Sequence, residues 1–366
     1  MKLALCTEIL YPLYGVERRV YEMATRFKKF DIDVDLYTST QPSVFPNLNI
    51  KQVSPQTILN PPKRNYAFCL QYWCALSKKL LKSNYDIIDL NGHLPLVPGS
   101  FIGKINKTPT IATIHDLYLN KWGGLYKMAG MLVGLPIEVL MVKMPYTKII
   151  TINSSVKRRL VKTFKIEESK ISLIPSGIDI KNIDKVKKTE KDNTIVYVGR
   201  LVPQKNLNIL LHAIKKIPGI KLKVIGEGQE LKRLLILSKQ LGIEKRVMFL
   251  GKVDSHEEVI KEIKKSSMLV LPSIRENFGI VPLEAMASGT PVISTNTEGP
   301  RDYINNGENG LLTEIGDVED LTKKISLLVT DKNLSKKLSI NGRKTAEKYD
   351  WNNIIKKIVK LYKEVV

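Results

Sequence analysis

The sequence has few cysteines, fewer acidic than basic residues and no long apolar run. Its three cysteines, Cys6, Cys69 and Cys74, form no Cys-x-x-Cys pair. Their odd number and spacing suit a reducing compartment and argue against a disulfide framework or a zinc site. The longest apolar segment, residues 128–142, is interrupted by a proline and a glutamate and falls short of the roughly 18–20 residues of a spanning helix. The first apolar stretch, residues 1–6, is too short for a signal peptide, so the sequence predicts a cytoplasmic protein.

Several catalytic motifs are missing as well. The four histidines do not cluster with cysteines or carboxylates in a metal-like spacing; they are His93, His115, His212 and His256. No Asp-x-Asp follows a predicted strand to hold Mg²⁺, and there is no P-loop or Gly-x-Ser-x-Gly elbow. Metal sites, P-loop nucleotide sites and serine-hydrolase sites are therefore not expected.

Positive charge is present in excess. Lysine and arginine number 58 against 36 acidic residues, and the net charge of +22 divides evenly between residues 1–180 and 181–366. An even excess favours anionic partners such as nucleotides, phosphorylated lipids, a membrane surface or nucleic acid. The alternative is that many of these lysines are simply solvated helix faces.

Strand and helix patterns alternate along the chain, which predicts an α/β fold with mostly parallel sheets. A polar, lysine-rich stretch, residues 181–193, marks the predicted domain boundary. The prediction is two doubly wound, Rossmann-like domains facing a cleft, residues 1–180 and 181–350, with the amphipathic helix 351–366 joined to the N-terminal domain. Residues 41–64 are predicted to be a long loop, and Ser154 or Ser155 is the expected N-cap of the helix that follows.

The stretch 271–300 carries the strongest local pattern, a strand, a polar loop, a short helix and a second strand. Ligands bind at the carboxyl ends of strands in such sheets. The loop and the helix carry Glu276 and Glu284, which could accept hydrogen bonds from sugar and ribose hydroxyls. The alternative is a pair of charges that complements the helix dipole.

A second loop offers cations. Gly199 and Arg200 end a predicted strand, and Lys205 stands at the start of the next helix. Two cations beside a helix N-terminus form a candidate diphosphate clamp, although a solvated surface pair is the alternative. Gly226 ends the following strand, in a Gly-Glu-Gly turn that lacks the third glycine of a dinucleotide fingerprint.

Two further candidates lie in the first half. His115, followed by Asp116, ends the predicted strand 110–114; a lone histidine there is as often structural as catalytic. Gly15 and Glu17 mark the first strand–helix turn, another candidate phosphate neighbour.

Taken together, these motifs resemble the family 4 glycosyltransferases. The resemblance rests on Pro175-Ser-Gly-Ile-Asp179, Gly199-Arg200 with Lys205, Gly226-Glu-Gly228 and the full context from Glu276 to Ala287. It covers essentially the whole chain and implies the GT-B fold. It also implies a retaining hexosyltransferase that uses a nucleotide-sugar donor, UDP- or GDP-linked, without a metal ion or other cofactor.

The resemblance implies a role for each candidate residue. Arg200 and Lys205 would hold the donor diphosphate and stabilise the leaving group. Glu284 would bind the ribose, and Glu276 would hold the donor sugar together with the backbone around Asn277, Phe278, Gly279 and Ile280.

In the N-terminal domain, the resemblance implies that His115 would lie against the sugar and Gly15 beside the diphosphate. The sequence departs from the family pattern at Val16, where a second glycine is common, and at Ser176, where asparagine is usual. Transfer would follow a front-face, oxocarbenium-like path, with Glu276 as covalent nucleophile disfavoured.

The acceptor is less defined. Residues 121–148 combine lysines with aromatic and aliphatic residues, a pattern of either an interfacial helix or a core-facing one. With the distributed charge, this gives the hypothesis of a peripheral protein on the cytoplasmic face of an anionic membrane. Its acceptor would be a hydroxyl or a phosphate, on a lipid-linked molecule or a growing glycan.

Two other classes compete with a transferase. One is another GT-B enzyme, such as a nucleotide-sugar epimerase or a phosphorylase, which shares part of the motif set. The other is a basic nucleic-acid-binding protein, which would need aromatic residues interleaved with basic ones or a recognised module. Neither feature is present, so no nucleic-acid partner is predicted.

Overall fold

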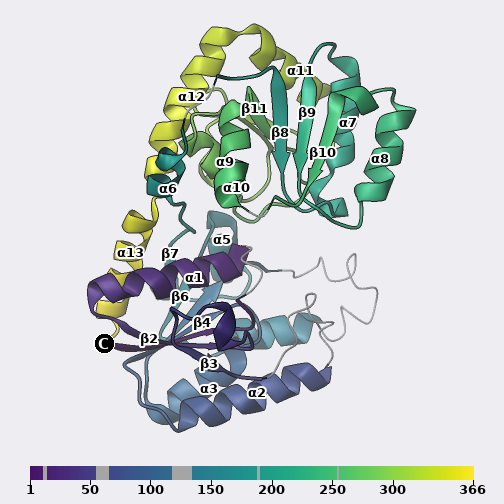
Figure 1. Ribbon diagram of the computed structural model, residues 1–366. Coiled ribbons are helices and arrows are strands. Elements are labelled where there is room, and N and C mark those ends of the chain that lie inside the picture. Colours follow the sequence, from purple (N-terminus) through teal and green to yellow (C-terminus); the bar gives the residue numbers. More distant parts are fainter. Residues whose placement is uncertain (11–14, 55–65, 118–133, 188–189, 254) are drawn as a thin grey trace. The chain divides into compact units, whose positions relative to one another are not determined.

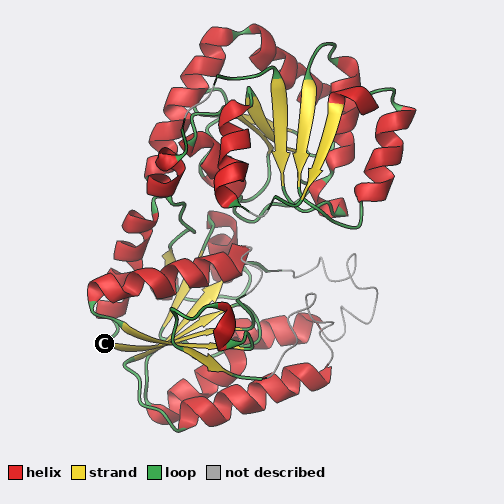
Figure 2. Ribbon diagram, viewed as in Figure 1, coloured by secondary structure: helices red, strands yellow, loops and turns green. Residues whose placement is uncertain are grey.

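The computed structural model describes residues 1–10, 15–54, 66–117, 134–187, 190–253 and 255–366. They form two compact units: unit 1 is Met1–Pro175 with Asn352–Val366, and unit 2 is Ser176–Trp351. Each unit is a sheet flanked by helices (Figures 1 and 2). All strand pairs within the two sheets are parallel. The predicted α/β fold with two Rossmann-like, parallel-sheet domains is thereby confirmed.

Unit 1 is built on a seven-stranded sheet of order β3-β2-β1-β4-β5-β6-β7. Its strands are β1 (Lys2–Thr7), β2 (Asp33–Thr38), β3 (Ile50–Gln52), β4 (Ile87–Asn91), β5 (Thr110–Ile114), β6 (Lys148–Thr151) and β7 (Ile171–Leu173). The central strands are buried on both faces, because helices cover both sides of the sheet. Because neighbouring strands are parallel, their carboxyl ends lie along one edge of the sheet.

The helices of unit 1 are α1 (Gly15–Phe27), α2 (Tyr66–Leu81), α3 (Leu96–Asn106), residues 134–143, α5 (Ser154–Lys162) and α13 (Trp351–Lys363). The sequence patterns do not predict α3, whose eleven residues include Pro98, Gly99 and Gly103. A Cβ at Gly99 would lie 2.2 Å from a Leu90 side-chain atom, and one at Gly103 would lie 2.1 Å from a Thr110 side-chain atom. Close packing of α3 on the sheet thus requires residues with low helix propensity.

Two local predictions are wrong. Strand β3 lies within residues 41–64, where a loop is expected; it is short, and it pairs in register with β2. The N-cap of α5 is Asn153 and not a serine, because its side chain accepts a hydrogen bond from the backbone N–H of Val156. The stretch 181–193, where the domain boundary is predicted, begins with helix α6 (Ile180–Lys185), and the chain passes from unit 1 to unit 2 at residues 175–176.

Unit 2 has a six-stranded sheet of order β10-β9-β8-β11-β12-β13. Its strands are β8 (Thr194–Val198), β9 (Lys221–Ile225), β10 (Val247–Gly251), β11 (Met268–Leu271), β12 (Val292–Thr295) and β13 (Leu311–Thr313). Besides α6, its helices are α7 (Leu207–Lys216), α8 (Leu231–Gln240), α9 (His256–Lys265), α10 (Ile280–Ala287), α11 (Val318–Thr330) and α12 (Lys332–Glu347). The sheet order reverses at β8 and β11, next to the loops that hold the candidate residues.

Membrane-spanning helices are not found among the residues that the structure describes, since none of their helices combines the necessary length with the necessary hydropathy. Much of the predicted interfacial segment 121–148, residues 121–133, lies outside the described residues.

Candidate active site

Two glycines bring the ends of β8 and β9 together in unit 2. Gly226 has φ +137°, and a Cβ there would lie 2.0 Å from the carbonyl oxygen of Gly199. The Gly199 amide in turn donates to the Ile225 carbonyl at 3.0 Å. A side chain at Gly226 would push the two turns apart, because the clash is with rigid backbone. The predicted strand-end glycines are therefore neighbours at the edge that carries Arg200.

Lys205 and Glu276 meet directly. Lys205 Nζ lies 2.5 Å from Glu276 Oε2, and both side chains are largely shielded from solvent. The two loops are also joined by backbone, since the Ile274 amide donates to the Gln204 carbonyl at 2.8 Å. The structure thus brings together a cation and a carboxylate that the sequence places on separate loops.

Arg200 follows Gly199 in the turn directly after β8. It is an exposed residue, and its carbonyl accepts a 3.0 Å hydrogen bond from the Tyr197 hydroxyl. Burial, together with the nearby Glu276 carboxylate, raises the pKa of Tyr197 well above its usual range. Tyr197 is therefore uncharged, and its hydroxyl holds the Arg200 turn through this hydrogen bond.

The loop before α10 is held by an aromatic cluster. Gly279 has φ +83°, which suits glycine, and its carbonyl accepts a 2.8 Å hydrogen bond from the Tyr303 hydroxyl. Phe278, Tyr303 and Tyr349 pack with ring centroids 5.8–6.0 Å apart. The Gly299 amide donates to the Glu276 carbonyl at 2.9 Å. This packing fixes the backbone of Asn277 to Ile280 beside the Lys205–Glu276 pair.

Glu284 has a partner that the sequence does not reveal. It lies on α10, is 4% exposed, and one carboxylate oxygen is 2.8 Å from Nε2 of His256. His256 is the first residue of α9, which Ser255 caps. A separation of 28 positions carries no local signal, so only the packing of α9 against α10 brings the two side chains together.

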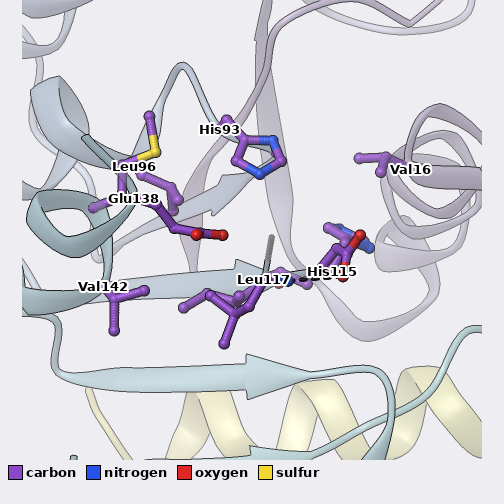
Figure 3. A pocket seen from close by; sticks show the side chains of 12 residues that line it. Val16, His93, Leu96, His115, Leu117, Glu138 and Val142 are labelled. Carbon is purple, nitrogen blue, oxygen red and sulfur yellow. Dashed lines mark hydrogen bonds between the residues drawn. The ribbon is translucent and has the colours of Figure 1, made fainter. Parts of the chain in front are cut away.

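His115 lines a cavity of about 40 Å³ in unit 1 (Figure 3). The walls come from α1, from the segments after β4 and β5, and from residues 134–143; they include Val16, His93, Leu96, Leu117 and Glu138. Figure 3 shows His93 and Glu138 directed into the same space. The volume suits a water molecule or one small group of a larger ligand.

His115 is uncharged at neutral pH. Burial, helped by the nearby Arg19 and His93, lowers the pKa of its imidazole to about 3. Among the described residues, no hydrogen-bond partner meets its buried Nε2. A neutral imidazole with an unused ring nitrogen can donate or accept one hydrogen bond toward a ligand.

Arg19, which interacts electrostatically with His115, belongs to a buried polar cluster that the sequence does not predict. Arg19 on α1 is fully buried, and its Nη1 donates to the Pro175 carbonyl at 2.6 Å. Asp89, at 0% exposure, interacts electrostatically with Arg19 and accepts a hydrogen bond from the Tyr362 hydroxyl. The cluster joins α1, β4 and α13, and so ties the C-terminal helix to unit 1.

The predicted site residues fall into two groups. Gly15, exposed at the first position of α1, and His115 belong to unit 1. The others belong to unit 2, where Gly199, Gly226, Lys205 and Glu276 make the close approaches described above. Within the described ranges, no three His, Cys, Asp or Glu side chains gather in a way that could hold a metal ion.

The chain is similar in sequence to two protein families and to known glycosyltransferases. Residues 14–182 match the family described as Glycosyltransferase Family 4, and residues 179–345 match the family described as Glycosyl transferases group 1. An uncharacterised glycosyltransferase of Methanocaldococcus jannaschii is 29% identical over 297 residues, 76% of this chain and 75% of that protein. The lipopolysaccharide core biosynthesis glycosyltransferase LpsE of Rhizobium meliloti is 36% identical over 151 residues, 41% of this chain and 44% of that protein.

Solved structures share the fold over the whole chain. Sucrose-phosphate synthase of Thermosynechococcus elongatus superposes with a TM-score of 0.85 at 22% identity, covering 100% of this chain and 98% of that one. HepE of Anabaena in complex with UDP superposes with a TM-score of 0.82 at 19% identity, covering 100% of both chains. HepE has also been solved with UDP-glucose. The fold is therefore GT-B, and the chain belongs to the glycosyltransferases of family 4, with a C-terminal half of the glycosyl transferases group 1 type.

Proposed function

We propose that this glycosyltransferase transfers a hexose from a UDP- or GDP-sugar to a hydroxyl of a glycan or lipid-linked acceptor, with retention of anomeric configuration. The observation that carries the proposal is the Lys205–Glu276 pair, at 2.5 Å, set between the Arg200 turn and the N-terminus of α10. A cation for phosphate and a carboxylate for sugar hydroxyls stand side by side there, as a nucleotide-sugar requires.

Unit 2 would hold the donor. Arg200 and Lys205 would contact the diphosphate and stabilise the negative charge that develops as it leaves. Lys205 also holds Glu276, which favours a role for Glu276 as hydrogen-bond acceptor for the sugar over a role as nucleophile. Glu284 would accept hydrogen bonds from the ribose, with His256 holding its carboxylate.

The structural neighbours support this donor class. HepE, which has the same fold, binds UDP and UDP-glucose in its solved complexes. The relatives compared above are glycosyltransferases, which favours sugar transfer over epimerisation, phosphorolysis or nucleic-acid binding. We infer that no metal ion is required, because two cationic side chains are available for the diphosphate.

Unit 1 would hold the acceptor near His115. The cavity there is lined by the carboxyl groups of Asp116 and Glu138, besides the two histidines. Carboxylates accept hydrogen bonds from hydroxyl groups and repel phosphates. We therefore favour a hydroxyl as the group that reacts and disfavour a phosphate.

A panel of UDP- and GDP-sugars tests the donor proposal. A donor that binds the native state raises the melting temperature, by an amount that grows with its concentration. The expected result is a shift with one nucleotide class, lost in Glu284→Gln, followed by transfer whose product keeps the donor's anomeric configuration by NMR. If no nucleotide-sugar shifts the melting temperature, or if the only product is an epimerised donor, the proposal is wrong.

A further inference from the structure

Two neighbouring helices of unit 1 expose large apolar side chains. On α2, Leu70 and Leu81 are 60% and 51% exposed, and on α3, Phe101 and Ile105 are 57% and 52% exposed. Single exposed apolar residues are normal on a protein surface, but these four lie on two helices that pack together (Figure 1). We call the outward surface of the two helices the α2–α3 face.

The two helices present this face in the same direction. Their inner residues share one hydrophobic core against the sheet, with Tyr72 and Leu76 from α2 and Ile102 from α3. Their C-terminal ends are joined, because Asn106 Nδ2 donates to the Leu80 carbonyl at 3.2 Å. Since both helices cover the same side of one sheet, their outer sides both point away from it.

The charged residues of the two helices have one sign. Exposed lysines lie on the same helices or directly after them; they are Lys78, Lys79, Lys82, Lys104 and Lys107. No aspartate or glutamate occurs in residues 66–85 or in residues 92–115, which contain both helices. Lysine stems can lie along an apolar surface while the ammonium groups reach an anionic layer.

The neighbouring helical segment 134–143 continues the pattern. Its inner residues Met141 and Val142 belong to the same core as α2 and α3. Its outer residues Val139, Leu140 and Lys143 are exposed. The combination of apolar and basic residues thus extends over the helices that cover this side of the sheet.

We propose that the α2–α3 face docks onto an anionic lipid bilayer. Phe101, Ile105 and Leu81 enter the headgroup region, and the exposed lysines lie against lipid phosphates. Apolar insertion and electrostatic attraction together are what hold a protein at an anionic interface, whereas either alone is weak. The proposal assigns membrane contact to α2 and α3, and it does not depend on the donor or on the reaction.

Vesicle flotation of the full chain tests this assignment. The protein is expected to float with vesicles of equal parts phosphatidylglycerol and phosphatidylcholine at low salt, and to remain behind with phosphatidylcholine alone. The variant Phe101→Ser with Ile105→Ser should lower the partition coefficient by about tenfold or more, since two apolar side chains lose their burial. Replacing Lys78, Lys79 and Lys104 by glutamine should also lower binding and weaken its salt dependence.

Matched controls keep the result specific. Leu235→Ser with Ile236→Ser changes two exposed apolar residues on the basic helix α8 of unit 2. Replacing Lys239, Lys332 and Lys336 by glutamine removes the same charge from exposed positions of unit 2. Both controls should bind vesicles like the parent protein, and circular dichroism should show that every variant is folded.

Three outcomes would overturn the proposal. The first is a parent protein that does not float with the anionic vesicles. The second is an equal loss of binding in the α2–α3 variants and in their controls. The third is a concentration-dependent dimer of the parent protein that Phe101→Ser with Ile105→Ser abolishes without any change in flotation, because the face would then belong to a second copy of the chain.

Discussion

Lys205 Nζ and Glu276 Oε2 are 2.5 Å apart across two loops that are 71 positions apart in the sequence. Each side chain neutralises the other where a donor would bring both a diphosphate and sugar hydroxyls. A cation held close to a carboxylate is already oriented, so little further ordering is needed when charge develops on a leaving group. This relationship leads to the first prediction.

Replacing Lys205 by alanine should lower kcat by about 10²–10³-fold, the loss typical of removing one group that stabilises transition-state charge. A thermal melt should show that the variant remains folded. Steady-state kinetics with the donor identified by thermal shift would measure the effect. Lys232→Ala, an exposed lysine on α8, is the matched control, and a Lys205→Ala enzyme with parental kcat would rule out a role in leaving-group stabilisation.

His256 is expected to position Glu284 for the ribose. Since a hydrogen bond to a charged group contributes about 1.5–3 kcal/mol, His256→Gln should raise the KM or Kd for the donor by roughly tenfold, with a smaller effect on kcat. His212→Gln, a histidine on α7 of the same unit, should leave both constants unchanged. In a double-mutant cycle with Glu284→Gln, the two effects should not be additive; full additivity would mean that the contact does not support donor binding.

The pH dependence of stability should carry a contribution from His115. Its pKa is lowered from 6.5 to about 3 in the folded protein, so the unfolded chain takes up a proton that the native protein does not. The stability that His115 contributes is present above pH 6.5 and is lost as the pH falls toward 3. Each pH unit removes up to ~1.4 kcal/mol of unfolding free energy.

The variant His115→Gln tests this dependence. Urea unfolding followed by circular dichroism should show a smaller loss of stability for the variant than for the parent protein across that pH range. The difference between the two proteins removes the contribution of carboxylates common to both. Parallel curves would show that His115 titrates normally.

Removing Asp89 should destabilise unit 1. Asp89→Ala leaves the fully buried Arg19 guanidinium without a nearby carboxylate and the Tyr362 hydroxyl without its acceptor, and an uncompensated buried charge typically costs about 3–5 kcal/mol. Asp33→Ala, at an exposed position of β2, should cost much less. Replacing both members, Arg19→Met with Asp89→Leu, should restore part of the loss in a thermal melt, because no unpaired charge remains. A double variant as unstable as Asp89→Ala would contradict this account.

Local pattern alone predicts much of unit 2. Helix α10 spans the residues that its periodicity indicates, and Gly199 and Gly226 take the strand-end positions expected of them. Helix α3 is not predicted because its glycines have poor helix propensity. They are present because a side chain at Gly99 or Gly103 would clash with Leu90 or Thr110. Strand β3 is not predicted because three residues are too few to show a period.

The sequence by itself determined the fold class and the family, because strand and helix periods and the motifs around Arg200, Lys205, Glu276 and Glu284 are local features of the chain. Only the tertiary structure decided which side chains meet. His256 reaches Glu284, Arg19 lies buried near Asp89, and Leu81 and Ile105 come to lie on one face, because packing joins positions that share no local pattern. Such contacts depend on how helices pack on a sheet, and this packing cannot be inferred from the periodicity of the sequence.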